Sequence, residues 1–166
     1  MNFILIGMPA SGKSCMGRSL ASKLKIKNVD TDKLIEARMG EKLQTLIDNL
    51  GVDKFREIEE DTLLNLDFDN CIVSTGGSAV YSARAMEKFK SEATVIYLKC
   101  SYATIEKRIG DFSKRGVVLR PGQTLRDLYN ERVPLYEKYA HITINCDGEA
   151  YPRYIAEAIK KIKERM

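Results

Sequence analysis

GMPASGKS, the stretch from Gly7 to Ser14, decides the fold of this 166-residue chain. It matches the phosphate-binding pattern G-x-x-x-x-G-K-[ST]. The apolar run FILI at 3–6 precedes it and predicts a buried strand, and residues 15–24 follow with helical spacing. A loop between a strand and a helix is the context that this pattern needs, because the start of a helix favours bound anions.

The residue types in the loop suit a nucleotide. Its backbone N–H groups can point at phosphate oxygens, Lys13 is expected to reach the β- and γ-phosphates, and the Ser14 hydroxyl is expected to bind Mg²⁺. The alternative is a glycine-containing turn with an incidental lysine. Average residue frequencies make such a chance match of order 10⁻⁵ to 10⁻⁴ per starting position.

Strand and helix signals alternate along the chain. Apolar, β-branched runs predict strands at 2–6, 26–29, 71–74, 94–98 and 142–145. Helical spacing predicts helices at 14–23, 31–39, 43–49, 53–66, 83–90, 102–109, 124–139 and 151–163. This alternation predicts a three-layer α/β P-loop fold with a five-stranded parallel sheet. Ligands in such folds bind beyond the carboxyl ends of the strands.

The composition narrows the class of protein. Residues 1–166 are expected to form one domain. The 44% apolar and 30% charged residues are typical of a soluble protein. Basic residues near the C-terminus alternate with Glu, which favours a solvated face over a nucleic-acid surface. The apolar runs are too short for a membrane span or a signal peptide.

The cysteines and the single histidine give no indication of a hydrolase site or a metal centre. The four cysteines show no metal-like spacing, which fits a reducing cytoplasm. Cys15 follows the phosphate loop and is a candidate for oxidation, whereas the other three are expected to be buried. His141, the single histidine, is expected to be structural.

Asp30-Thr31-Asp32 follows the second predicted strand and opens a helix. Carboxylates two residues apart on a loop diverge and can serve different partners. One can hold Mg²⁺ through water, while the other orients a substrate hydroxyl or accepts its proton. The alternative is simple capping of the helix, since Asp and Thr are common at this position.

Arg56 and Glu59 are three residues apart on a predicted helix and share a face. A carboxylate beside a guanidinium fixes its orientation and leaves N–H donors for a substrate carboxylate. A routine surface ion pair is the alternative. Arg132 lies in a later helix interrupted by Pro134, and from there it can reach back into the same cleft.

Two irregular stretches complete the pattern. Gly76-Gly77 follow the third predicted strand, where they allow a close approach of backbone to ligand or form a tight turn. Residues 110–122 form the one long connection and include Arg115 and Arg120. Its length and charge favour a mobile lid over a phosphorylated substrate, with a solvated surface loop as the alternative.

Taken in order, these stretches resemble the shikimate kinase family over nearly the whole chain, from Asn2 to about Ile144. The family carries a phosphate loop, a D-x-D, an F-R-x-x-E, a G-G-G, a lid arginine and a late R-x-P-L-Y. The matching residues here are Gly7–Ser14, Asp30 and Asp32, Phe55, Arg56 and Glu59, Gly76 and Gly77, Arg115, and Arg132 with Pro134, Leu135 and Tyr136.

The resemblance implies a role for each matching residue. ATP is bound by Gly7, Ala10, Ser11, Gly12, Lys13, Ser14 and Cys15, with Arg108 near the adenine. Mg²⁺ is bound through Ser14 and Asp30. The substrate is bound by Asp32 at its ring hydroxyls, by Arg56 and Arg132 at its carboxylate, and by Gly76, Gly77 and Ser78 along the cleft. Catalysis depends on Lys13, Asp32 and the lid arginine Arg115.

The implied activity is ATP- and Mg²⁺-dependent phosphorylation of the 3-hydroxyl of shikimate, a step toward chorismate and aromatic amino acids. From the composition and the cysteines we expect a cytoplasmic protein with no nucleic-acid or membrane partner, and we expect it to be a monomer. Three alternatives stay open from the residues alone. They are a gluconate-type sugar-acid kinase, a nucleoside or nucleotide kinase, and a regulatory protein that binds ATP without turnover.

The chain departs from the family at three places. Ser78 stands where the family has its third glycine and is expected to add a hydroxyl near the acceptor. Ala10 replaces a usual loop glycine. Arg115 is followed by Gly116-Val117-Val118 in place of the usual P-L-L. These departures bear on which polyhydroxy acid the pocket takes.

Overall fold

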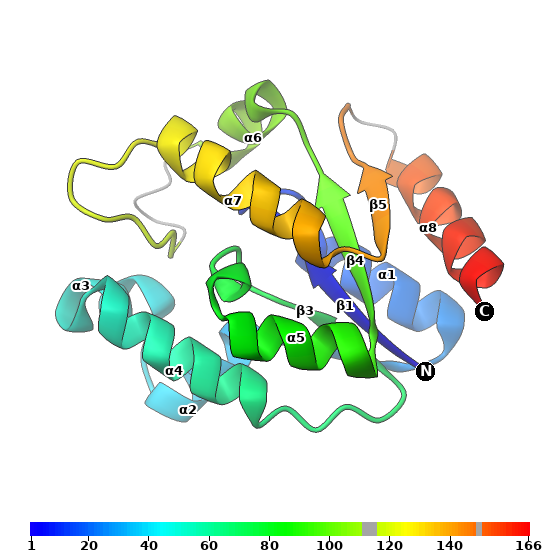
Figure 1. The fold of residues 1–166 in the computed structure, drawn as a ribbon, viewed down its shortest axis with the longest axis horizontal. Helices are drawn as coiled ribbons and strands as arrows, with labels where there is room; N and C mark the ends of the chain where they lie inside the picture. The colour runs from blue at the N-terminus through cyan, green and yellow to red at the C-terminus, as the bar shows by residue number, and fades with distance from the viewer. Residues whose placement is uncertain (111–115, 149–150) are drawn as a thin grey trace.

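The computed structural model describes residues 1–110, 116–148 and 151–166. Its strands form a parallel sheet in the order β2-β3-β1-β4-β5 (Figure 1). They are β1 (Asn2–Ile6), β2 (Lys27–Asp30), β3 (Cys71–Ser74), β4 (Thr94–Lys99) and β5 (Ile142–Asn145). The predicted five-stranded parallel sheet is confirmed in the described part of the chain, and the predicted strand limits are moved by at most one residue.

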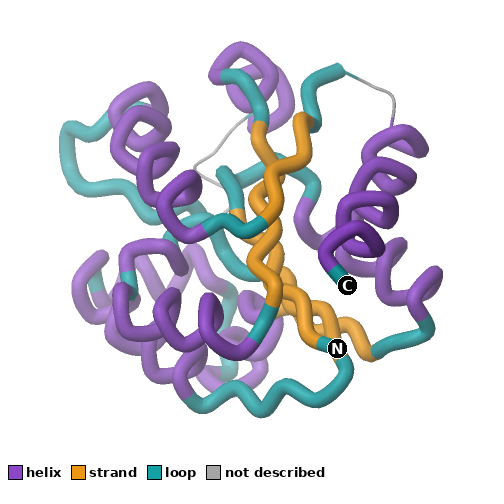
Figure 2. The backbone as a smooth tube through the Cα atoms, turned by 45° about the vertical axis from the view of Figure 1, so that its right-hand side comes forward, coloured by secondary structure: helices purple, strands orange, loops and turns teal. Residues whose placement is uncertain are grey.

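Helices cover both faces of the sheet (Figure 2). The helices in the described part of the chain are α1 (Lys13–Leu24), α2 (Thr31–Met39), α3 (Leu43–Leu50), α4 (Val52–Leu64), α5 (Ala83–Glu92), α6 (Tyr102–Ile109), α7 (Leu125–Tyr139) and α8 (Tyr151–Arg165). Helices α1 and α8 pack together on one face, and α5 and α7 on the other. The short 3₁₀ helix η1 (Ala79–Tyr81) was not predicted, because three residues carry no periodic signal.

The strand sequences follow from their places in the sheet. In β1 and β3 the side chains on both faces are buried, because helices cover both sides of central strands. These strands are therefore continuous apolar runs. The edge strand β5 instead alternates, with Ile142 and Ile144 buried and Thr143 and Asn145 exposed.

Gly17 lets α1 lie close against β3. A Cβ at this position would stand 2.3 Å from Ser74 Oγ and 3.0 Å from Asn28 Oδ1. Ser74 Oγ also donates a hydrogen bond of 3.0 Å to the carbonyl oxygen of Lys13. Because packed interiors leave no room for extra atoms, this close contact holds the start of α1 against the carboxyl end of β3.

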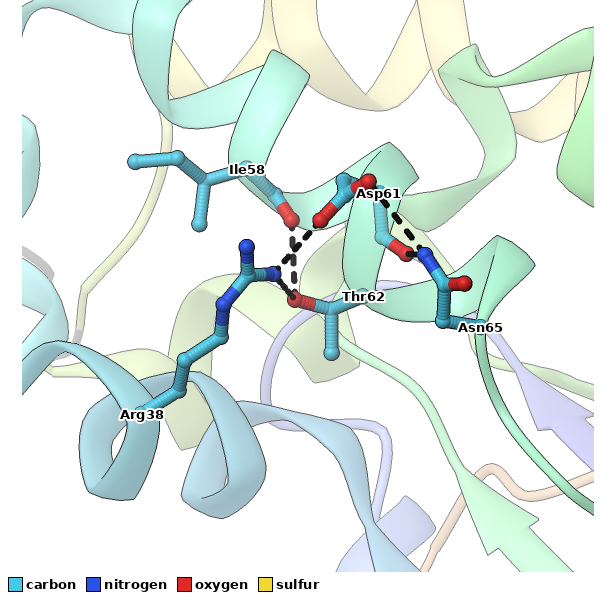
Figure 3. Close-up of polar contacts among 5 residues, drawn as sticks. All are labelled: Arg38, Ile58, Asp61, Thr62 and Asn65. Carbon is cyan, nitrogen blue, oxygen red and sulfur yellow. Dashed lines mark hydrogen bonds and ion pairs between the residues drawn. The ribbon is translucent and has the colours of Figure 1, made fainter.

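Helices α2, α3 and α4 form one unit beside the sheet. A small apolar cluster joins them and includes Ile35, Leu46 and Phe55. Polar contacts extend the junction, since Arg38 Nη1 donates to Thr62 Oγ1 at 3.2 Å and pairs with Asp61 at 2.8 Å (Figure 3). The half-exposed ion pair contributes less than about 1 kcal/mol, so apolar packing dominates. This unit carries Asp32 and Arg56 and fixes their relative position.

The described end of the expected lid is anchored to this unit. Val118 is 3% exposed and belongs to the same apolar cluster. Gly116 has a φ of +64°, and a Cβ there would stand 2.9 Å from the Cβ of Leu43. The Gly116 N–H donates to Gln44 Oε1 at 3.1 Å. Glycine is therefore required at 116 by backbone conformation and by space.

The cysteines and the histidine lie as expected. Cys71, Cys100 and Cys146 are buried, Cys15 is exposed, and all four, which the structure describes, are free thiols. His141 Nδ1 accepts a hydrogen bond of 3.0 Å from the N–H of Val95, in keeping with a structural role. None of the described helices is long and apolar enough to cross a membrane.

Candidate active site

The phosphate loop forms the turn between β1 and α1. Its backbone folds back on itself through a hydrogen bond of 3.1 Å from the N–H of Ser11 to the carbonyl of Met8. Gly12 and Ala10 both have positive φ, of 97° and 66°. The left-handed conformation costs an alanine roughly 1–2 kcal/mol, which explains why glycine is usual where this chain has Ala10.

Lys13 is the first residue of α1 and is buried under the loop. Its Nζ donates to the carbonyl oxygens of Gly7 at 2.7 Å and Met8 at 2.8 Å. Burial lowers the pKa of Lys13 to about 8, a shift partly opposed by the nearby Asp32 carboxylate. The ammonium group thus lies at the centre of the loop, where it can neutralise phosphate charge.

Asp30 both caps a helix and faces the phosphate loop. Its Oδ1 accepts hydrogen bonds from the N–H groups of Asp32 and Lys33, at 3.1 and 3.3 Å. Its Oδ2 accepts a hydrogen bond of 2.8 Å from Ser14 Oγ. The capping interpretation is therefore right for Oδ1 of Asp30, whereas Oδ2 is held beside the Ser14 hydroxyl of the phosphate loop.

Ser14 and Asp30 fit the Mg²⁺ that the family implies. They bring two oxygen donors together, and Mg²⁺ commonly takes one or two protein oxygens while keeping water and phosphate ligands. Within the described residues, no group of three or more His, Cys, Asp or Glu side chains could hold a metal by itself. The donor set therefore suits a nucleotide-bound Mg²⁺.

Asp32 lies in the first turn of α2, not in the loop before it. Its Oδ1 would be 2.5 Å from a Cβ at Gly76, so the carboxylate lies against the glycine turn after β3. Burial, and then the charge of Asp30, raise the pKa of Asp32 to about 6. A carboxyl group with this pKa is a competent proton acceptor near neutral pH.

A cavity of about 380 Å³ joins these elements. Its lining includes Lys13, Ser14, Asp32, Gly76 and Gly77. The phosphate loop, the Asp-x-Asp segment and the glycine turn are thus brought together at the carboxyl ends of the strands, as the sequence predicts. The cavity has room for a small polyol beside a phosphate chain.

A second cavity, of about 320 Å³, lies on the other side of the loop. It is lined by Ser11, Gly12, Cys15, Arg108 and Tyr151 among others. Arg108 Nη2 donates to the carbonyl oxygens of Cys146 and Gly148, at 2.8 and 2.7 Å. This cavity is where a nucleoside attached to loop-bound phosphates would lie, with Arg108 in its wall.

The prediction of an ion pair between Arg56 and Glu59 is wrong. Glu59 is 3% exposed, and its Oε1 accepts a hydrogen bond of 2.6 Å from Ser78 Oγ. The Arg56 guanidinium lies instead 3.8 Å from the centre of the Tyr81 ring. The two residues share a helix face, but Glu59 points into the interior, where Ser78 supplies its hydrogen bond. Burial raises the pKa of Glu59 to about 7.

Arg132 reaches the cleft from α7, as expected, and is 1% exposed. Its Nη2 donates to the carbonyl of Val118 at 3.1 Å, and its Nε donates to Tyr81 Oη at 3.2 Å. A Cβ at Gly77 would stand 2.8 Å from Arg132 Nη1. The guanidinium is therefore held between the glycine turn and Val118.

A family model described as shikimate kinase matches residues 9–164 of this chain. The chain belongs to the shikimate kinase family. The shikimate kinase of a Sulfurihydrogenibium species is 34% identical to this family member, covering 99% of both chains. That of Rhodococcus erythropolis is 36% identical, covering 98% of this chain and 97% of its own length.

A solved structure agrees with the family assignment. Shikimate kinase from Acinetobacter baumannii, in complex with shikimate, is similar to this family member with a TM-score of 0.90 and 29% identity. The likeness covers 99% of this chain and 93% of that chain. These matches do not favour the sugar-acid kinase, nucleotide kinase or regulatory alternatives.

The structure shows where Ser78 and Arg120 lie, but not Arg115. The Ser78 hydroxyl was expected near the acceptor, but it is engaged as a donor to Glu59. Arg115 lies in 111–115, outside the described residues. Arg120 is exposed and pairs with Asp53 at 2.7 Å.

Sequence reasoning missed Tyr81. This residue contacts both Arg56 and Arg132, yet it belongs to none of the recognised motifs. Tyr136 does belong to one, and its hydroxyl donates to the carbonyl of Gly77 at 2.6 Å. The only sequence signal for Tyr81 is its position four residues after the glycine pair.

The two titrating groups predict a bell-shaped pH dependence of kcat/KM. A carboxylate at Asp32 can accept a proton only when it is ionised, so we expect activity to rise as pH increases through about 6. An amine at Lys13 can neutralise phosphate only when it is protonated, so we expect activity to fall as pH increases through about 8. Bound ATP favours the protonated form of Lys13, so at saturating ATP the basic limb of the kcat profile should move to higher pH. A flat profile of kcat/KM between pH 5 and 9 would contradict these roles.

Proposed function

We propose that this protein transfers the γ-phosphoryl group of ATP to the 3-hydroxyl of shikimate, giving shikimate 3-phosphate and ADP. This step leads toward chorismate and the aromatic amino acids. The observation that carries the proposal is the cavity in which the phosphate loop, Asp32 and the Gly76-Gly77 turn meet. It occurs in a chain whose family model and relatives are shikimate kinases.

The charges around the cleft suit an anionic acceptor. Arg132 lies against Gly77, and Arg56 lines a neighbouring cavity with Ser78 and Tyr81. Both guanidinium groups contact Tyr81. A planar carboxylate is the natural partner of guanidinium groups. A nucleoside acceptor would leave these cations without a partner, whereas shikimate supplies one carboxylate and several hydroxyls.

The proposed chemistry needs positioning and charge neutralisation. The acceptor oxygen attacks the γ-phosphorus, the bond to the bridging oxygen of ADP breaks, and the hydroxyl proton passes to Asp32. Lys13 stabilises the negative charge on the transferring and leaving phosphates. Ser14 and Asp30 would hold Mg²⁺, and the bound ion would further neutralise the charge of the phosphate oxygens.

We assign the lid function to Arg115 rather than to Arg120. Arg120 is exposed and already pairs with Asp53, so Arg120→Ala should change kcat by less than about twofold. Arg115→Ala should lower kcat about 10²-fold, because it removes a positive charge from the transferring phosphate. Steady-state kinetics on the two variants compares them directly. Equal losses would contradict the assignment.

The proposed function is tested by ADP release from Mg·ATP with shikimate, gluconate, quinate and a set of nucleosides. Shikimate should be turned over with the highest kcat/KM. Turnover on gluconate in its place would favour a sugar-acid kinase, and turnover on a nucleoside would favour a nucleoside kinase. ATP binding with no turnover on any acceptor would favour a regulatory protein.

We also propose that residues 1–166 act as one kinase domain, as a cytoplasmic monomer without a nucleic-acid or membrane partner. The basic residues of α8 support this proposal, since Lys161 pairs with Glu157 at 3.0 Å and Lys160 with Glu164 at 4.0 Å. These pairs belong to a solvated face. Light scattering should give the mass of a single chain.

A further inference from the structure

Tyr81 contacts both arginines that are expected to bind the carboxylate of the acceptor. The Arg56 Cζ is 3.8 Å from the centre of its ring, and the Arg132 Cζ is 5.2 Å from it. Both distances are within the range in which a guanidinium is attracted by an aromatic face. The Tyr81 hydroxyl also accepts a hydrogen bond from Arg132 Nε at 3.2 Å and donates to Glu131. One side chain thus contacts both cations.

The residue expected to orient Arg56 is engaged elsewhere. Glu59 accepts its hydrogen bond from Ser78, and its Oε2 is buried without a partner. Arg56 Nε is likewise buried without a partner, and no ion pair to Arg56 forms within the described residues. The Tyr81 ring is therefore the contact that determines where the Arg56 guanidinium lies.

The backbone holds Tyr81 in a fixed relation to the glycine turn. Tyr81 is the last residue of η1, and its N–H donates to the carbonyl of Ser78 at 3.1 Å. The N–H of Ala79 donates to the carbonyl of Gly76 at 3.2 Å. The ring is thus tied, within five residues, to the turn that lines the cavity with Asp32.

We propose that Tyr81 is a positioning residue for the carboxylate of the acceptor: it orients Arg56 through its ring and Arg132 through its ring and hydroxyl. The ring face offsets the repulsion of two cations brought close together. This inference rests on the proposed function, since it assumes an acceptor that carries a carboxylate beside its hydroxyls. It adds a specificity determinant that favours acids over neutral polyols.

The test compares Tyr81→Leu and Tyr81→Phe with wild type, using shikimate and its neutral methyl ester as acceptors. Tyr81→Leu should raise the KM for shikimate about tenfold, equivalent to about 1.4 kcal/mol. Tyr81→Phe keeps the ring and should raise it about threefold. The KM for ATP and the KM for the ester should stay unchanged, because neither depends on the carboxylate contact.

Tyr102→Leu is the matched control. Tyr102 lies under Arg126, whose Cζ is 4.1 Å from the ring centre, in a pair outside the cleft. Its loss should leave the KM for shikimate unchanged. Thermal unfolding of all variants reports stability. If Tyr81→Leu does not fold, Tyr81→Phe decides the matter, since an unchanged KM for shikimate in that variant overturns the inference.

The remaining outcomes are distinct. Equal rises in KM for shikimate and its ester indicate a merely structural role and overturn the inference while leaving the proposed function intact. No turnover of shikimate by wild type overturns the proposed function, and this inference fails with it.

Ser78→Gly gives a further check, because it frees Glu59 to approach Arg56. The effect of Tyr81→Leu should then be smaller in the Ser78→Gly background.

Discussion

Asp32→Asn should lower kcat about 10³-fold, with a small change in the KM for ATP. Asn has the size and shape of Asp but cannot take the proton of the acceptor hydroxyl. Asp32 suits this task because burial raises its pKa to about 6 and because it lies against the Gly76 turn. The substitution should also abolish the acid limb of the pH profile.

A second consequence follows for the basic limb. The Asp32 carboxylate raises the pKa of Lys13 against the effect of burial. Its neutralisation should therefore lower the pKa of Lys13 and move the basic limb to lower pH. Asp67→Asn, on an exposed loop, is the matched control and should leave kcat unchanged. Retention of wild-type kcat by Asp32→Asn would show that proton acceptance lies elsewhere.

Lys13→Met should lower kcat about 10³-fold, because it removes a preorganised positive charge from the phosphate site. The ammonium group of Lys13 is held by the carbonyls of Gly7 and Met8, so little reorganisation is needed when phosphate binds. Met keeps the length and the apolar part of the side chain, which limits damage to the loop. Single-turnover kinetics with Mg·ATP and shikimate measures the loss at the chemical step.

The control for this variant is a surface lysine. Lys163→Met, on the exposed face of α8, should retain wild-type kcat and KM. If Lys13→Met weakened ATP binding but kept kcat, Lys13 would act in binding alone. That result would contradict its assignment to the transferring phosphate.

Local patterns predicted the framework of this protein well. The loop motif, the apolar run at 3–6 and the helical spacing after it all depend on neighbours in sequence, and they placed β1, Lys13 and α1 correctly. The central strands were also predicted closely, because burial on both faces makes them continuous apolar runs. The D-x-D segment was correctly predicted to follow β2 and open a helix, although Asp32 lies in the first turn of that helix.

Contacts between distant segments could not be predicted in this way. Glu59 was expected to pair with Arg56 on its own helix, but the approach of η1 brings the Ser78 hydroxyl to it instead. Tyr81 follows the glycine pair without any periodic or motif signal, so its contact with two arginines emerges only from the tertiary structure. Side chains that close a site from several elements need the fold before they can be placed.

The most direct test of the account is to identify the product formed from shikimate and Mg·ATP. Phosphorus and proton NMR of the reaction mixture report both the transfer and the position of the new phosphate. We expect one product, shikimate 3-phosphate, formed in equal amount with ADP. Phosphate on another hydroxyl, or ADP with free phosphate and unchanged shikimate, would contradict it.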